Sequence, residues 1–218
     1  MRIVFSFFLL LTVVGGYSQQ LPAQIQLPNG WKISPVGKSF ELGDLPLNIA
    51  VSKSSKYMAV TNNGQSTQTI QLVDVKSEHI IDQVEIEKSW YGIVFTSDEK
   101  YIYVSGGHDN RILKYEIVDS KLKRVDSIQL DRSWPVKVGP AGIALDESNN
   151  LIYVVTREDK MLYVVDLRTK QVLKKYGLDA EAYDCKLNVK ANELYVSCWG
   201  CDKVLVFDTK NKNWKQPV

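Results

Sequence analysis

The sequence is poor in the residues from which catalytic and metal sites are most often built. It has 2 histidines and 3 cysteines among 218 residues. No zinc-protease HExxH motif, no nucleophile-elbow GxSxG motif and no glycine-rich phosphate loop is present. We therefore expect neither a metal nor a cofactor. No catalytic set is visible, and whether the protein is an enzyme stays open.

Strong charge and long apolar runs are also missing. The net charge of +2 is too small to favour nucleic acid as a partner, and no stretch of 18 apolar residues exists that would span a membrane. With 44% hydrophobic and 24% charged residues, the composition is typical of a globular domain.

The first 18 residues have the pattern of a secretory signal peptide. Arg2 supplies a positive start, residues 3–14 are almost entirely apolar, and the small residues Gly16 and Ser18 precede a cleavage site before Gln19. An uncleaved anchor is the alternative, but the apolar run is short for one. The sequence therefore predicts a periplasmic or secreted protein, with a lead-in at 19–37 and the folded region at 38–218.

A short strand motif recurs four times along the chain. Val60, Val104, Val154 and Val196 each close an apolar strand, and they are spaced 44, 50 and 42 residues apart. A period of 40 to 50 residues with strand-like content is typical of β-propeller blades. The sequence thus predicts an all-β fold, a β-propeller with about four blades of four antiparallel strands.

Short apolar runs bounded by turn residues locate the strands, which we name a to d from the inner to the outer strand of each blade. In the second blade the four strands are expected at 92–95, 101–105, 111–117 and 124–130. In blades 1, 3 and 4, strand a is expected at 48–52, 142–145 and 184–189. Strand c of the same blades is expected at 69–73, 161–165 and 203–207. An acidic residue recurs near the end of strand c: Asp74, Glu116, Asp166 and Asp208. Asp74, Asp166 and Asp208 each end their strand and are expected to hydrogen-bond the c-to-d turn.

The two ends of the repeat predict an open arrangement. Residues 38–42 stand where a d strand precedes the first blade, and the fourth blade reaches Trp214, where its own d strand should begin. Four blades can close the smallest kind of ring. An unclosed stack would leave apolar blade faces in water, so we favour a segment of a larger propeller of the seven-bladed type.

Four segments resemble the N-terminal propeller of secreted YncE-family proteins: residues 27–31 (LPNGW), 42–48 (LGDLPLN), 60–68 (VTNNGQSTQ) and 105–111 (SGGHDNR). The resemblance covers about residues 27–218. It implies an exported propeller, which in many members is followed by a phosphoesterase domain of the alkaline phosphatase superfamily. No phosphoesterase segment is present here, so no residue inherits metal-dependent hydrolysis. The blade pattern alone also fits lactonase-like propellers.

One face of a propeller carries both the d-to-a connections and the b-to-c loops, around the central channel. Aromatic, amide and charged residues on these loops are the candidate ligand-binding surface. They are Asn62, Asn63, Trp90, Tyr91, His108, Asp109, Arg111, Trp134, Arg157, Tyr183 and Trp199. The alternative for the tryptophans is a structural role as spacers between blades.

Two local patterns remain open. His108 and Asp109 are the one acid–base neighbourhood, although Asp109 can equally serve only to turn the loop. Cys198 and Cys201 form a CxxC pattern at the end of a strand, where a redox role is not expected because no βαβ unit surrounds it. In an exported protein a structural disulfide is favoured, either between Cys185 and Cys198 or between Cys198 and Cys201.

Two functions follow from these patterns. The favoured one is an exported scaffold that presents a loop face to an unidentified small ligand or to a partner such as a downstream phosphoesterase domain. The alternative is the propeller part of a hydrolase, with the phosphoesterase fused downstream or with lactonase-like activity at the channel mouth. A nucleophile with its base, or a metal set, would favour the second, and neither is visible.

Overall fold

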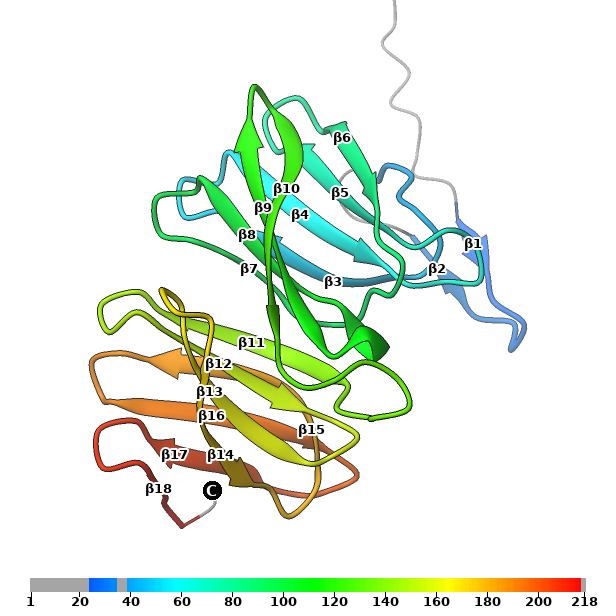
Figure 1. The fold of residues 1–218 in the computed structure, drawn as a ribbon. Coiled ribbons are helices and arrows are strands. Elements are labelled where there is room, and N and C mark those ends of the chain that lie inside the picture. The colour runs from blue at the N-terminus through cyan, green and yellow to red at the C-terminus, as the bar shows by residue number, and fades with distance from the viewer. Residues whose placement is uncertain (1–23, 35–38, 217–218) are drawn as a thin grey trace, which may run out of the picture. The chain divides into compact units, whose positions relative to one another are not determined.

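A computed structural model of the chain describes residues 24–34 and 39–216 (Figure 1). The chain divides into two units, residues 1–40 and residues 41–218. The expected signal peptide at 1–18 lies outside the described residues. In the first unit, β1 (Ile25–Gln26) pairs with β2 (Lys32–Ile33) across a turn in which Gly30 has a φ of +83°.

The second unit consists of four antiparallel four-stranded sheets, which confirms the all-β propeller with four blades. Blade 1 is β3 (Pro46–Val51), β4 (Tyr57–Asn62), β5 (Thr69–Asp74) and β6 (His79–Glu85); blade 2 is β7 (Ile93–Phe95), β8 (Tyr101–Ser105), β9 (Arg111–Val118) and β10 (Lys121–Gln129); blade 3 is β11 (Pro140–Asp146), β12 (Leu151–Thr156), β13 (Met161–Asp166) and β14 (Val172–Gly177); blade 4 is β15 (Glu181–Asn188), β16 (Glu193–Trp199), β17 (Val204–Asp208) and β18 (Asn213–Trp214).

The apolar core lies between the blades. Along β8, Ile102 and Val104 pack into a cluster shared with blade 1, while Tyr103 between them packs into a cluster shared with blade 3. The same alternation in β12 sends Val154 toward blade 2 and Tyr153 toward blade 4. Successive side chains of a strand point to opposite faces of the sheet. Strands buried on both faces therefore need apolar residues at almost every position, as these sequences have.

The inner strands approach one another closely. A Cβ atom placed on Gly142 of β11 would lie 2.6 Å from the Cα atom of Asp184 in β15. A side chain at this position would push the two strands apart. The glycine is therefore what allows blades 3 and 4 to meet near the channel, where the candidate site begins.

The acidic residues after strand c bear out the expected turn role in three blades. Asp74 accepts hydrogen bonds from the backbone N–H of Ser77, and Asp166 and Asp208 do the same in the later blades. In blade 2, β9 runs past Glu116 to Val118, close to the expected end of the strand at 117. Blade 2 turns instead through a two-residue loop, 119–120, in which both residues have positive φ.

A d strand was expected at residues 38–42, before the first blade, and another near Trp214, at the end of the fourth. Residues 39–42, where part of a d strand was expected, are not in a strand, and Lys38 lies outside the described residues. The d strand of blade 4 is present as β18, of which only two residues pair with β17. No helix in the described part of the chain is long and apolar enough to cross a membrane.

Candidate functional site

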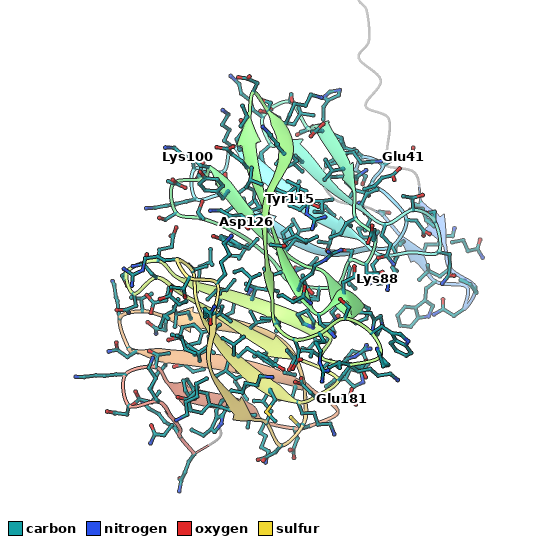
Figure 2. All side chains as sticks on the ribbon, viewed as in Figure 1. Glu41, Lys88, Lys100, Tyr115, Asp126 and Glu181 are labelled. Atoms are coloured by element: carbon teal, nitrogen blue, oxygen red, sulfur yellow. The ribbon has the colours of Figure 1, made fainter. Side chains whose placement is uncertain are left out.

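The d-to-a connections and the b-to-c loops of the four blades emerge together, toward the right of the view in Figure 1. The a-to-b and c-to-d turns emerge toward its left and top. In Figure 2, Lys88 of the β6–β7 connection and Glu181 at the start of β15 lie toward the first side, whereas Lys100 of the β7–β8 turn lies toward the other.

On the first side, five residues from the loops and from the ends of β15 and β16 line a hollow of about 380 Å³, which we call the aromatic pocket. They are Trp90, Arg157, Glu181, Tyr183 and Trp199. Beside the pocket the ring of Tyr91 lies 4.6 Å from that of Tyr183, and the ring of Tyr183 lies 5.5 Å from that of Trp199. Blades 2, 3 and 4 all contribute, so the pocket exists only when the propeller is assembled.

Arg157 is held in place by its backbone and by its charge. Its N–H donates to the carbonyl of Gly139 at 3.0 Å, and the N–H of Glu158 donates to Val138 at 3.1 Å. Gly139 has a φ of +63°, and a Cβ atom there would lie 2.8 Å from the side chain of Glu158, so glycine is required. The guanidinium stacks over the ring of Trp90, with its central carbon 4.8 Å from the ring centroid.

The neighbouring carboxylate balances this cation. Arg157 and Glu158 form an ion pair of 2.5 Å, and this contact lowers the pKa of Glu158. Glu158 is therefore charged at neutral pH, and the pair as a whole is neutral. On the other side, burial raises the pKa of Tyr91, and the nearby carboxylate of Asp184 raises it further. Tyr91 is thus a neutral hydrogen-bonding group at the edge of the site.

A second and larger hollow, the inter-blade cleft, lies between blades 1 and 2 and has a volume of about 890 Å³. Its floor is apolar and its rim is charged. Arg111 bonds Asp109 at 2.8 Å and Glu87 at 3.3 Å, and Lys88 bonds Asp109 at 3.2 Å. Asn63 and Trp90 also line the cleft, so Trp90 forms part of the wall of both hollows.

Seven of the eleven sequence candidates do not line the aromatic pocket, among them Asn62, Trp134 and His108. Asn62 is 1% exposed and donates to Thr69 and Gln71 within blade 1. Trp134 is 64% exposed and does not line the pocket. His108 is exposed and borders a small hollow with Trp90 and Arg157, while its neighbour Asp109 is bonded to Arg111 and Lys88.

Asn110 is an organising residue that the sequence did not single out. It is fully buried with a φ of +55°. Its side-chain oxygen accepts from the N–H groups of Val138 and Gly139, and its amide donates to the carbonyls of Arg132 and Val136. One side chain thus fixes the whole β10–β11 connection, including the glycine that positions Arg157. Glu181 was missed as well, because only the β15–β16 pairing places it opposite Trp199.

The three cysteines are free in the structure. Of the two disulfides considered, Cys185–Cys198 is expected from a hairpin centred on Ala191; in the structure Asn188 pairs with Glu193, which puts Cys185 opposite Val196. Cys198 and Cys201 are neighbours, and burial together with Cys201 raises the pKa of the Cys198 thiol to about 12. Within the described residues, no group of three or more histidine, cysteine, aspartate or glutamate side chains is placed to hold a metal ion.

Comparison with known proteins identifies the fold. No family model matches the sequence, and no curated protein matches it. Solved structures do match: hydrazine synthase of Kuenenia stuttgartiensis (15% identity, TM-score 0.61, covering 84% of this chain and 52% of that one), a functionally unknown protein of Desulfotomaculum acetoxidans (12%, 0.64, 87% and 59%) and the periplasmic gluconolactonase PpgL of Pseudomonas aeruginosa (13%, 0.61, 79% and 53%).

These neighbours are β-propeller proteins, and at such low identity the likeness concerns the fold alone. The chain spans between half and three fifths of the length of each. Its own four blades and these structural neighbours lead to the same conclusion: the chain has the β-propeller fold.

Proposed function

We propose that this protein is an exported β-propeller scaffold that binds a small ligand at the aromatic pocket. The observation that carries the proposal is the convergence on one hollow of Trp90, from the β6–β7 connection, with Tyr183 of β15 and Trp199 at the end of β16. A concave, largely aromatic site with a few polar groups is the usual form of a small-molecule site.

The solvent exposure of Trp199 supports binding over a purely structural role. Its side chain is 67% exposed, although it is large and apolar. A tryptophan that served only as a spacer between blades would be covered by them. An exposed indole at the edge of a hollow instead has surface available to bury on binding, which is how aromatic residues contribute most to affinity.

A matched pair of variants tests this role. Trp199→Ala removes an exposed indole from the pocket, and Trp134→Ala removes an equally exposed indole, 64% against 67%, from a connection outside it. Screening a small-molecule library by ligand-observed NMR should find compounds that bind wild type and Trp134→Ala but bind Trp199→Ala at least about tenfold more weakly. Binding that is independent of Trp199 would contradict the proposal.

Export is the second part of the proposal and rests on the N-terminal pattern and on the resemblance to YncE-family propellers. Mass spectrometry of the secreted or periplasmic protein should give a chain that begins near Gln19. A soluble pool that retains Met1 would contradict it. In such a protein a partner domain, for example a phosphoesterase, is the alternative occupant of the loop face.

Hydrolysis of a lactone at the same face is a second candidate function. The favouring observation is the structural neighbour that is named a periplasmic gluconolactonase. Release of acid from glucono-δ-lactone, followed in a pH-stat, should then exceed the spontaneous rate and should fall in a His108→Ala variant. A rate equal to the spontaneous one would remove this candidate.

A further inference from the structure

We infer that the aromatic pocket recognises a neutral carbohydrate. The C–H face of a sugar ring would stack on the exposed aromatic surface, and its hydroxyl groups would hydrogen-bond Glu181 and Arg157. The inference rests on the proposed ligand-binding function and names the class of ligand.

The stacking surface is formed by Tyr183 and Trp199, which line the pocket, with Tyr91 beside them. The rings of Tyr91, Tyr183 and Trp199 contact one another in sequence, with interplanar angles of 46° and 41°. The most exposed ring, Trp199, lies at the open end of this series. A pyranose ring offers a flat patch of C–H groups on one side, which suits such a surface, and it directs its hydroxyls outward from the edge.

Polar groups lie next to the position that the edge of a stacked sugar ring would occupy. Glu181 pairs directly with Trp199 across the β15–β16 ladder, so its Cβ atom lies beside that of the indole. Arg157 faces the pocket from blade 3 and is held in place by Glu158 and Gly139. A purely apolar ligand would displace the water that hydrogen-bonds Glu181 and Arg157 without offering new hydrogen bonds, and this desolvation costs free energy. Hydroxyl groups can both donate to Glu181 and accept from Arg157.

The arrangement disfavours a cationic ligand. A cation held by aromatic rings lies within about 6 Å of each ring centroid and must fit between them. Here the rings of Tyr183 and Trp199 are only 5.5 Å apart and touch each other, so they form no cage. The face of Trp90 is already occupied by the guanidinium of Arg157.

The charges disfavour an anionic ligand as well. The charge of Arg157 is matched by Glu158, whose lowered pKa keeps it ionised. Glu181 then leaves the pocket with a carboxylate that would repel a phosphate or a sugar acid. The volume of about 380 Å³ lies near the lower end of the usual range for ligand sites and suits one or two sugar rings.

Isothermal titration with methyl β-glucoside, maltose and cellobiose tests the inference, with choline and gluconate as charged comparators. At least one neutral sugar should bind wild type and Trp134→Ala equally. Its affinity should fall at least about tenfold in Trp199→Ala. Between about 0.02 M and about 0.5 M NaCl the affinity should change less than about twofold, because screening acts on charged ligands.

The Glu181→Gln variant distinguishes the ligand classes further and guards against a misfolded Trp199→Ala. It should weaken a neutral sugar only severalfold, because the amide still bonds hydroxyl groups. Trp199-dependent binding of choline or gluconate without any neutral sugar would overturn the carbohydrate assignment and leave ligand binding at the pocket intact. If folded Trp199→Ala and Glu181→Gln bind every probe as wild type does, both the inference and the proposed function are overturned. If no probe binds, the carbohydrate inference is overturned, and the library screen alone decides the proposed function.

Discussion

Asn110 shows how one side chain can organise a functional loop. Residues with positive φ are favourable positions for asparagine, but here the side chain also satisfies four backbone groups of the β10–β11 connection. Buried backbone groups that lose their partners are costly. The consequence reaches the pocket, because the same connection contains Gly139 and so positions Arg157.

Asn110→Ala is therefore expected to lower the free energy of unfolding by about 2–4 kcal/mol. Asn150→Ala is the matched control, since Asn150 has a φ of +53° in the β11–β12 turn and its side chain makes no hydrogen bond within the described residues. Urea denaturation followed by tryptophan fluorescence measures both. Equal losses would show that the backbone conformation alone matters at Asn110.

At this scale the sequence could place candidates on the correct loops but not rank them. Residues 88–90 and 132–134 are near copies, yet Trp90 lines three hollows and Trp134 is exposed. The connection from β10 to β11 is longer than that from β6 to β7, so the second tryptophan is carried away from the channel. Such a difference arises from the path of the loop and leaves no local signature.

The c-to-d turns repeat one device at the scale of the element. Hydrogen bonds from turn N–H groups lower the pKa of Asp74, Asp166 and Asp208. A carboxyl group with a lowered pKa in the folded state contributes stability above its unfolded pKa of about 3.9. This contribution is lost as the pH falls through the lower pKa of the folded state.

The triple variant Asp74→Asn, Asp166→Asn and Asp208→Asn should consequently show a shallower loss of stability than wild type between about pH 5 and pH 2. Guanidinium denaturation at a series of pH values gives the slope. Asp119→Asn is the control, because the side chain of Asp119 accepts no hydrogen bond from the described residues. An unchanged slope in the triple variant would mean that these bonds persist in the unfolded chain.

Strand positions were largely predictable, and their deviations have simple causes. The expected strand at 101–105 matches β8, and 161–165 falls within β13, because apolar runs bounded by turn residues mark strands clearly. Strand β15 begins at Glu181, three residues before the expected 184. Its first residues are Glu181, Ala182 and Tyr183, and a bulge between Ala182 and Asp184 interrupts the alternation of inward and outward side chains by which strands are recognised in a sequence.

For the whole molecule, the position of the core between blades sets the pattern of stability. Blades 2 and 3 have an apolar cluster on each face, while blades 1 and 4 share one cluster each with a neighbour. Ile49 and Val51 of β3 are 50% and 55% exposed, although they belong to an inner strand. Opening of either middle blade therefore breaks apolar contacts on both of its faces, whereas opening of blade 1 or blade 4 breaks them on one face.

Hydrogen exchange followed by mass spectrometry should find β8 and β12 the slowest to exchange and β3 and β17 faster. The middle strands report on opening of the whole stack, whereas the outer blades can open alone. Equal protection of β3 and β8 would contradict this order and would show that the exposed face of blade 1 is covered in solution.

Repeated units that touch only their neighbours behave like a one-dimensional chain, in which a local disturbance must pass through every link. The contact between Tyr91 and Tyr183 breaks that rule, since it joins the entrance of blade 2 to blade 4 at 4.6 Å without passing through blade 3. This contact links the two blades directly, beside the aromatic pocket. A ligand bound against Tyr183 would therefore stabilise blades 2 and 4 together, although they are not neighbours. The energetic coupling between these two blades would rise with the ligand concentration.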